Sequence, residues 1–388
     1  MKVLVAHNFY QQPGGEDQVF RDEVAMLRDR GNEVVEYTVH NDALAGLGKI
    51  ELARKTIWNQ QTYEQLSEVV RREKPAIAHF HNTFPLMSPS AYYAAREGGA
   101  RVVQTLHNFR LMCPSATLYR DGHVCEDCVG RRFAWPAIAH ACYRGSRSAS
   151  AVTAVMLRQH RARGTWHDAV DVYIALTQFA RDKMIQGGLP REKIVVKPNF
   201  VSPDPGEGTG GGRFVLFVGR LTEEKGIDTL LRAWESATPQ GLMLRIAGDG
   251  PLRGRVEQAS HRLRSIEYLG RRPSAEVYAI LAHAEALLFP SVWYEGLPRT
   301  IIEAFSKGTP VVASKLGSMA ELVTDGRNGL LVEPGHVAAW ARALGELSCR
   351  TDRLSELRRG AREEFLRCYT ADRNYPMLMA AYEQALAN

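Results

Sequence analysis

Two loops in the second half of the chain carry residue types suited to binding a nucleotide. In FVGRLTEEK, the cations Arg220 and Lys225 follow Gly219 and precede a segment with helical spacing. Backbone amides and the helix dipole favour an anion at a helix N-terminus, so this loop is suited to a diphosphate. In AGDGP, Gly248 would let the backbone approach a nucleotide closely. The alternative for the two cations is a pair of ordinary exposed side chains.

Two glutamates lie in the stretch EGLPRTIIEA. Glu295 is in a Gly/Pro turn, and Glu303 is in an apolar helix that Pro298 is suited to begin. A carboxylate in a buried helix is unfavourable unless a partner donates hydrogen bonds to it, and a ribose diol is such a partner. Glu295 would then lie near the hydroxyls of a sugar. The alternatives are stabilisation of Glu303 by the helix dipole and ordinary turn chemistry at Glu295.

Four of the six cysteines fall in one segment with the spacing C-x11-C-x2-C-x13-C: Cys113, Cys125, Cys128 and Cys142. The central pair is of the kind that binds one tetrahedral metal ion, and the two flanking thiols would complete a closed structural zinc site. Such a site would order a long segment that has little apolar periodicity. The alternatives are disulfides, an iron–sulfur cluster or unligated thiols packed as small apolar side chains, and His123 or His140 could replace a cysteine.

These residues must be positioned by short apolar strands that alternate with helical segments. In the first half, the predicted strands are KVLVAHN, EVVEYTVH, IAHFHN, RVVQTLHN, DVYIALTQ and KIVVKPN. After a Pro/Gly-rich stretch, the alternation restarts with RFVLFVGRL, LMLRIAGDG, IEYLG, EALLFPS and TPVVAS. The pattern predicts an α/β protein with two tandem doubly wound, Rossmann-like domains. Such domains bind ligands at the carboxyl ends of their strands, here in an inter-domain cleft.

The domain boundaries follow from this alternation. The first domain is expected at residues 1–200, with a cysteine-containing insertion at about 109–148, and the second at 201–370. The last helix, 371–388, is expected to cross back to the first domain.

Basic residues are in excess only in the first half of the chain. Residues 1–200 contain 26 Lys and Arg against 20 Asp and Glu, whereas residues 201–388 contain 23 of each. Within the first half, Arg96–Arg163 holds eleven arginines and four acidic residues, which suits an anionic membrane surface or a phosphorylated acceptor. The alternatives are a solvated face and a nucleic-acid binder, and the segment lacks a recognisable nucleic-acid-binding motif.

The sequence predicts neither a signal peptide nor a membrane span. The N-terminus becomes polar within ten residues, and no run of about 18 apolar residues occurs. Six cysteines in 388 residues do not form a secreted disulfide framework. We therefore expect a cytoplasmic protein, with peripheral contact at the inner face of the plasma membrane through the arginine-rich segment.

Several motifs occur in a fixed order along the chain. The second half carries VGRLTEEKG, AGDGP, EGLPRTIIEA and GSMAELVTDGRNGLLVEPG, and the first half carries PGGEDQVF at Pro13–Phe20 and QTLHN at Gln104–Asn108. Together they resemble the retaining GT-B glycosyltransferases of family 4. PGGEDQVF is similar to the glycine loop of that family, and QTLHN is similar to its strand that ends in an active-site histidine. Cys113–Tyr143 is an insertion relative to simpler members.

The resemblance implies that the second domain binds a nucleotide-sugar donor. Arg220 and Lys225 would bind the diphosphate and Glu303 the ribose. Glu295 would bind the donor sugar. Gly219 and Gly248 would form the glycine loops of this site, and Gly296 and Leu297 would provide backbone amides.

In the first domain, the resemblance implies that His107 approaches the sugar near the reacting carbon. Gly14 and Gly15 would let the glycine loop close over the phosphates. The chain departs from the family at Pro298 and Arg299, where members often carry a Phe-Gly pair.

The activity implied by the resemblance is a retaining transfer of a hexose-type sugar from a nucleoside-diphosphate sugar to a glycan or lipid-linked acceptor, in bacterial surface polysaccharide synthesis. Cations and helix dipoles at the leaving diphosphate would stabilise the transition state selectively. The other common solution uses a divalent ion on a D-x-D motif, which the chain lacks, so catalysis is expected without a metal. The alternatives are a nucleotide-sugar epimerase of the same fold and a non-catalytic binder of sugar nucleotides or nucleic acid. No nucleic-acid partner is expected.

Overall fold

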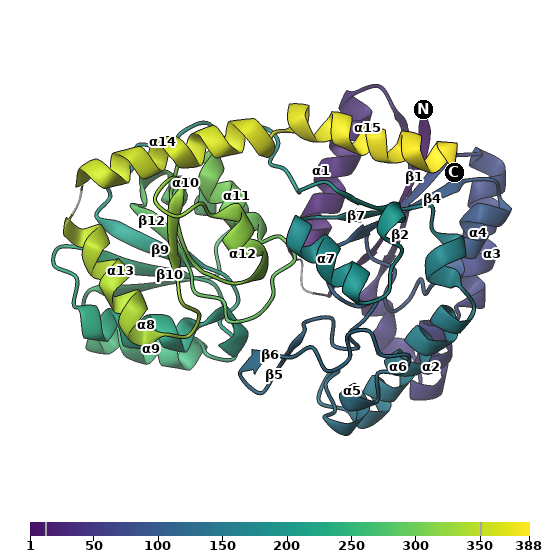
Figure 1. The fold of residues 1–388 in the computed structure, drawn as a ribbon, viewed down its shortest axis with the longest axis horizontal. Helices are drawn as coiled ribbons and strands as arrows, with labels where there is room; N and C mark the ends of the chain where they lie inside the picture. Colours follow the sequence, from purple (N-terminus) through teal and green to yellow (C-terminus); the bar gives the residue numbers. More distant parts are fainter. Residues whose placement is uncertain (12–13, 350) are drawn as a thin grey trace. The chain divides into compact units, whose positions relative to one another are not determined.

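The computed structural model describes residues 1–11, 14–349 and 351–388, and these form two compact units (Figure 1). The first unit comprises Met1–Leu118, Glu126–Asn199 and Asp372–Asn388, and the second comprises Tyr119–Cys125 and Phe200–Ala371. Each unit is built around one six-stranded parallel sheet with flanking helices, which confirms the predicted pair of α/β domains.

The first sheet has the strand order β2-β1-β3-β4-β7-β8, so the order reverses between β1 and β3. Its strands are β1 (Lys2–Phe9), β2 (Glu33–His40), β3 (Ile77–Phe80), β4 (Arg101–Leu106), β7 (Val172–Ala175) and β8 (Ile194–Val196). The helices of this unit are α1 (Gly15–Asp29), α2 (Lys49–Ile57), α3 (Gln60–Glu73), α4 (Ser90–Glu97), α5 (Trp135–Ala139), α6 (Arg147–Ala162), α7 (Gln178–Gln186) and α15 (Ala371–Ala387).

Burial along these strands explains their composition. Every residue of β3 and β7 is buried, because helices cover both faces of the middle of the sheet. Strands buried on both faces read as continuous apolar runs rather than as alternating patterns. The edge strand β2 instead alternates exposed and half-buried residues along EVVEYTVH.

The second sheet has the order β11-β10-β9-β12-β13-β14, and this order reverses between β9 and β12. Its strands are β9 (Phe214–Val218), β10 (Met243–Ala247), β11 (Ile266–Gly270), β12 (Ala286–Phe289), β13 (Val311–Ser314) and β14 (Gly329–Val332). Its helices are α8 (Ile227–Ala237), α9 (Arg253–Arg262), α10 (Ser274–His283), α11 (Arg299–Ser306), α12 (Gly317–Leu322), α13 (Val337–Cys349) and α14 (Thr351–Cys368). Strand β14 was not among the predicted strands. Helices α8 and α13 pack together, and their tryptophans Trp234 and Trp340 are fully buried in the core of this unit.

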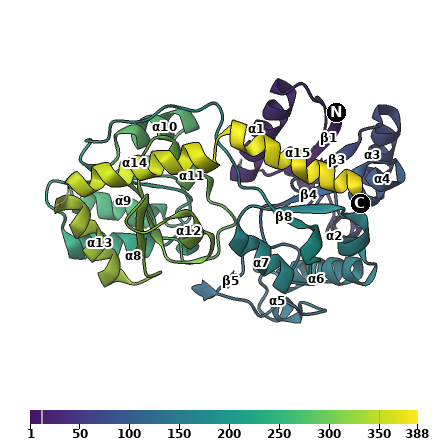
Figure 2. The same cartoon turned by 45° about the horizontal axis from the view of Figure 1, so that its top comes forward.

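The expected insertion is divided between the two units. Its hairpin, β5 (Tyr119–Arg120) and β6 (His123–Val124), belongs to the second unit, whereas the residues on either side belong to the first. Helix α5 of the insertion packs on α6, which also contacts α2, and Figures 1 and 2 show these helices together.

The last helix, α15, packs on the first unit. Its Tyr382 hydroxyl lies 2.9 Å from His79 Nδ1, and its Asn374 donates a hydrogen bond of 2.6 Å to the Pro198 carbonyl oxygen. Both side chains are fully buried. Among the described residues, no helix is both long enough and apolar enough to cross a membrane.

Candidate functional site

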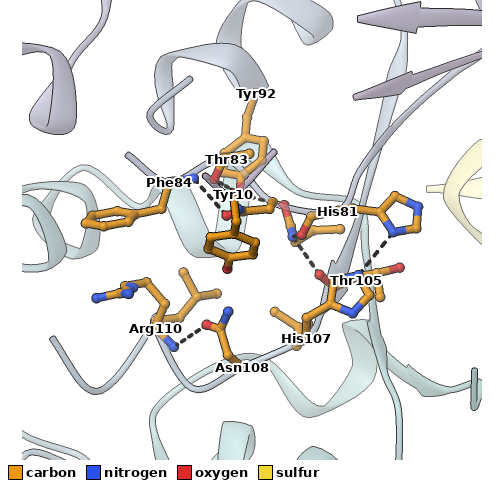
Figure 3. A pocket seen from close by; sticks show the side chains of 13 residues that line it. Tyr10, His81, Thr83, Phe84, Tyr92, Thr105, His107, Asn108 and Arg110 are labelled. Carbon is orange, nitrogen blue, oxygen red and sulfur yellow. Dashed lines mark hydrogen bonds between the residues drawn. The ribbon is translucent and has the colours of Figure 1, made fainter. Parts of the chain in front are cut away.

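A pocket opens at the carboxyl ends of the strands of the first unit, near the reversal between β1 and β3 (Figure 3). Ligands of doubly wound sheets bind at such reversals, because the loops after the two strands diverge there. The pocket is lined by Tyr10, His81, Asn82, Thr83, Phe84, Tyr92, Gln104, Thr105, Leu106, His107, Asn108, Arg110 and Leu111.

His107, the predicted active-site histidine, follows β4 and lines this pocket. Its Nε2 lies 3.0 Å from His81 Nδ1. Burial, together with the neighbouring His81, holds the pKa of His107 well below its ordinary 6.5. At neutral pH the imidazole is therefore uncharged, and one of its ring nitrogens has a lone pair that can accept a hydrogen bond.

A buried charge network lies behind His107. The fully buried Glu23 of α1 places Oε2 2.9 Å from Lys197 Nζ and Oε1 3.0 Å from His79 Nδ1. His81 Nε2 is 3.2 Å from the same Oε1. Burial alone would raise the pKa of Glu23, but Lys197, His79 and His81 outweigh burial and hold it well below the ordinary 4.5. Burial lowers the pKa of His81 to about 4, although Glu23 opposes that shift.

Glu23, His79 and His81 also form the one group of three potential metal ligands found among the described residues, with the ligand atoms within 4.8 Å of one another. The Lys197 ammonium already faces the same carboxylate at 2.9 Å. It supplies the positive charge that a metal ion would otherwise provide, so the group needs no metal to neutralise Glu23.

Gly14 and Gly15 lie at the N-terminus of α1. The Gly14 amide donates a hydrogen bond of 2.9 Å to Asp17 Oδ2, and Asp17 Oδ1 is 2.7 Å from His7 Nε2. A Cβ atom at either glycine would meet nothing within 4 Å. Packing within the chain therefore does not explain why these positions lack side chains. Pro13, which begins the predicted glycine loop, lies outside the described residues.

In the second unit, Lys225 and Glu295 meet at the reversal between β9 and β12. Lys225 Nζ lies 2.7 Å from Glu295 Oε1, which also accepts hydrogen bonds from Ser291 Oγ at 2.8 Å and Trp293 Nε1 at 2.7 Å. The ammonium also lies over the Trp293 ring, 5.3 Å from its centroid. The structure thus joins two predicted site residues from loops 70 positions apart in the sequence.

Arg220 and Glu303 differ in how closely they pair with other charged side chains. The Arg220 side chain is 67% exposed, and its nearest carboxylate, Glu224, is 3.7 Å away. Glu303 on α11 is instead paired with Arg299, whose Nε donates to it at 2.8 Å. The partner that makes this carboxylate tolerable in an apolar helix is therefore an arginine one turn earlier. Sequence reasoning did not identify this pair.

The two loops of the second unit that the sequence predicts to bind a nucleotide pack against each other. Gly248 has a φ of +152°, and a Cβ atom there would lie 1.9 Å from the carbonyl oxygen of Gly219. Contact between the loops explains why Gly248 is a glycine, whereas the sequence suggested a close approach to a nucleotide. Leu297 is buried just before α11, and Gly296 separates it from Glu295.

The structure does not support the predicted zinc site at the four cysteines. Among the described residues, no three of their sulfur atoms lie within 4.8 Å of one another. Cys113 Sγ lies 3.1 Å from Ser115 Oγ, and Cys128 and Cys142 pack in a small apolar cluster with Ala137. The hairpin that follows Cys113 takes Cys125 into the second unit. The geometry therefore does not support the zinc prediction.

Sequence reasoning missed the buried network and one pocket residue: His7, Asp17, Glu23, His79, His81, Arg110 and Lys197. A signal was present for several of them. His79 and His81 are two residues apart at the end of an apolar strand, so they share one face. Glu23 has helical spacing with Phe20 and Leu27, which are buried.

Two descriptions of protein families match the chain. Residues 13–205 match "Glycosyltransferase Family 4", and residues 212–349 match "Glycosyl transferases group 1". The two matched ranges lie one after the other along the chain. The range that matches the family 4 description contains the pocket at His107, and the range that matches the group 1 description contains the Lys225–Glu295 pair.

The chain spans about half the length of the curated relatives it matches. WcaL of Escherichia coli strain K12, whose name assigns it to colanic acid biosynthesis, is 33% identical over 212 residues, which are 50% of this chain and 52% of WcaL.

Solved structures share the fold over nearly the whole chain. HepE of Anabaena in complex with UDP and glucose has a TM-score of 0.69 and 17% identity, covering 98% of this chain and 99% of HepE. Sucrose-phosphate synthase of Thermosynechococcus elongatus has a TM-score of 0.74 and 16% identity, with 100% of both chains covered. This likeness confirms the predicted GT-B fold.

Proposed function

We propose that the protein is a retaining glycosyltransferase that moves a hexose-type sugar from a nucleoside-diphosphate donor to a glycan or lipid-linked acceptor. The observation that carries the proposal is the Lys225–Glu295 pair, 2.7 Å apart, at the strand-order reversal of a glycosyltransferase domain. A cation and a hydrogen-bond acceptor at that place suit a diphosphate joined to a sugar. The names and titles of the relatives and structural neighbours, which include UDP and glucose, support this reading.

On the donor side, Arg220 and Lys225 bind the diphosphate, and their charge stabilises the negative charge that develops as the sugar leaves. Glu295, with the Gly296 and Leu297 amides, holds the donor sugar, and Glu303 receives the ribose hydroxyls beside Arg299. Gly219 shapes the loop that carries Arg220. Gly14 and Gly15, which have open space around them, let the loop before α1 approach the phosphates.

In the reaction, the bond between the anomeric carbon and the diphosphate oxygen breaks, and the acceptor oxygen bonds to that carbon. The acceptor proton passes to an oxygen of the leaving phosphate, so the step needs neither a metal nor a redox partner. His107 is held uncharged by burial and accepts a hydrogen bond from a sugar hydroxyl near the reacting carbon.

An anionic membrane surface is the proposed setting of the acceptor. Between Asp127 and Asp168 the chain has seven arginines and no acidic residue. The α5 residue Trp135 is 53% exposed, and α5 packs on α6. Arginines beside an exposed tryptophan suit the headgroup region of anionic lipid. Binding to vesicles should rise with the acidic lipid fraction, fall with salt and weaken in Trp135→Ala. Vesicle binding that depends on neither lipid charge nor salt would contradict an anionic membrane surface as the site of the acceptor.

The proposed activity is tested by incubating the protein with a panel of UDP-, GDP- and ADP-sugars and measuring release of the nucleoside diphosphate. We expect slow hydrolysis of one donor, which a suitable acceptor accelerates. Interconversion of sugars without release would indicate an epimerase. Binding without any turnover of any donor would indicate a non-catalytic sugar-nucleotide binder.

A further inference from the structure

Arg110 is a guanidinium at the edge of the first-unit pocket whose charge is not matched by a carboxylate. Its Cζ lies 4.1 Å from the centroid of the Phe84 ring and 4.9 Å from that of Tyr143, and Nη1 donates to the Pro114 carbonyl oxygen. Among the described residues, no acidic side chain forms an ion pair with it. The Glu16 carboxylate attracts Arg110 electrostatically but forms no ion pair with it, and it accepts hydrogen bonds from the Tyr10 hydroxyl at 2.8 Å and Asn108 Nδ2 at 3.0 Å.

A guanidinium has five N–H donors in a plane, and the carbonyl of Pro114 uses one of its nitrogens. None of the Arg110 nitrogens is both buried from solvent and without a partner, so the remaining donors are reachable from outside the chain. The two aromatic rings fix the plane of the group. Arg110 is therefore a preorganised set of donors at the edge of the pocket.

Burial lowers the pKa of Arg110 from its ordinary value, although Tyr143, Tyr10 and Glu16 oppose this shift, so burial disfavours the charge more than these neighbours stabilise it. Buried charges in proteins are normally paired. An anion delivered by a ligand would provide the missing partner, and it would bind through a two-pronged contact because carboxylate and phosphate oxygens match the spacing of guanidinium donors.

We propose that Arg110 forms a subsite for an anionic group, a carboxylate or a phosphate, on the acceptor. The inference rests on the proposed function, because it assigns the first-unit pocket to the acceptor. Figure 3 shows Arg110 below the Phe84 ring, on the side of the pocket away from His107. An acceptor sugar between them would place its anionic group at Arg110 and a hydroxyl near His107.

Binding of three simple sugars tests the subsite with the full chain. Glucuronate and glucose 1-phosphate carry the two kinds of anion, and glucose is the neutral control. By titration followed by nuclear magnetic resonance, we expect at least one anionic sugar to bind about tenfold or more tightly than glucose, the effect of one charged two-pronged contact. Which of the two is preferred distinguishes a carboxylate from a phosphate.

Arg110→Gln should remove this preference and leave glucose binding unchanged. Arg144→Gln is the matched control, because Arg144 also stacks on Tyr143, at 5.5 Å, but is exposed and does not line the pocket. If Arg110→Gln does not fold, Arg110→Lys keeps the charge without the planar donors and should reduce the preference by about threefold or more.

Equal binding of charged and neutral sugars by the unmodified protein, or a preference that survives Arg110→Gln, would overturn the subsite. Release of nucleoside diphosphate from sugar donors is measured in parallel. No release from any donor, with the anion preference intact, would reject the proposed function and keep an anion site in the pocket. Release without any anion preference would keep the function and reject the subsite.

Discussion

The charged residues at the two strand-order reversals of this chain differ in how deeply they are buried. Behind the pocket of the first unit, Glu23 and Lys197 are fully buried and pair with each other and with histidines. At the reversal of the second unit, Arg220 is largely exposed, and the half-buried Lys225 pairs with the buried Glu295. The same topological position therefore carries fully buried, internally paired charges in one unit, and in the other a paired lysine beside an exposed arginine.

This difference predicts which property each substitution changes. A buried pair that loses one member leaves an uncompensated charge in the core, so the first unit should respond in stability. An exposed cation contributes little to folding, so the second unit should respond in ligand binding and turnover.

Glu23→Gln should have the largest effect. It leaves Lys197 buried without a carboxylate, and breaking a buried ion pair costs about 3–5 kcal/mol. We expect the free energy of unfolding, measured in urea, to fall by that amount. The matched control is Glu36→Gln, which breaks the exposed pair with Arg28 and should change stability by less than about 1 kcal/mol. Similar losses in both variants would contradict the distinction between the two kinds of charge.

Stability should also fall as the pH is lowered from about 6.5 to 4. Burial sets the pKa of His81 at about 4, below its ordinary 6.5, so between these values the unfolded chain binds a proton that the folded chain does not. The resulting loss is roughly 3 kcal/mol from this group. Burial raises the pKa of Glu23, but Lys197 outweighs burial and holds this pKa below its ordinary value. Protonation of Glu23 therefore also lowers stability, at still lower pH.

The measurement is the free energy of unfolding as a function of pH, compared with His81→Asn, which lacks this proton. The other titratable groups around His81, namely Glu23, His7, His79 and His107, remain in both proteins, as does Lys197 beside Glu23. The slope between pH 6.5 and 4 should be smaller in the variant. An identical slope would show that His81 does not titrate as its burial requires.

Arg220→Ala should lower turnover of the donor by about two orders of magnitude, as removal of a preorganised charge at a leaving group does. Its stability should stay within about 0.5 kcal/mol of the unmodified protein, because the side chain is 67% exposed. Release of nucleoside diphosphate and thermal unfolding measure the two effects. Arg253→Ala, another exposed arginine of this unit, is the control and should change neither. Turnover that survives Arg220→Ala would remove this residue from the site.

Glu303→Gln should weaken binding of free nucleoside diphosphate by about tenfold, the loss of one charged hydrogen bond to a ribose. Arg299→Leu tests the alternative that Glu303 serves only as the partner of Arg299. Titration of the nucleotide into both variants separates the two roles. If Arg299→Leu weakens binding and Glu303→Gln does not, the ribose contact belongs elsewhere.

The sequence predicts the sheets well because parallel strands covered on both faces are continuous apolar runs. All eleven predicted strands are present. Strand β14 is short, lies inside a loop-rich stretch and begins with Gly329, where a Cβ atom would lie 2.0 Å from the Val311 carbonyl oxygen. The close approach of a neighbouring strand requires this glycine, and the local sequence pattern carries no sign of that approach.

The sequence could not predict which residues far apart in the chain contact each other. Lys225 and Glu295 were singled out separately, but their contact depends on strand order. The cysteine spacing was consistent with zinc, yet no three of the four sulfur atoms lie within 4.8 Å of one another among the described residues. The unmatched Arg110 became visible only when its neighbours were known, because it is one of eleven arginines of similar local character between Arg96 and Arg163.

The place of α15 in the first unit has a consequence for the order in which the chain is made. Asn374 Oδ1 accepts a hydrogen bond of 3.0 Å from Lys197, and 177 residues separate them. A ribosome adds about 5–20 residues per second, so Lys197 is synthesised roughly 10–35 s before this partner. During that interval the first domain has its complete sheet but lacks Asn374 and Tyr382 against its buried charges. The buried charges on this side of the domain therefore remain without these two partners until α15 has been synthesised.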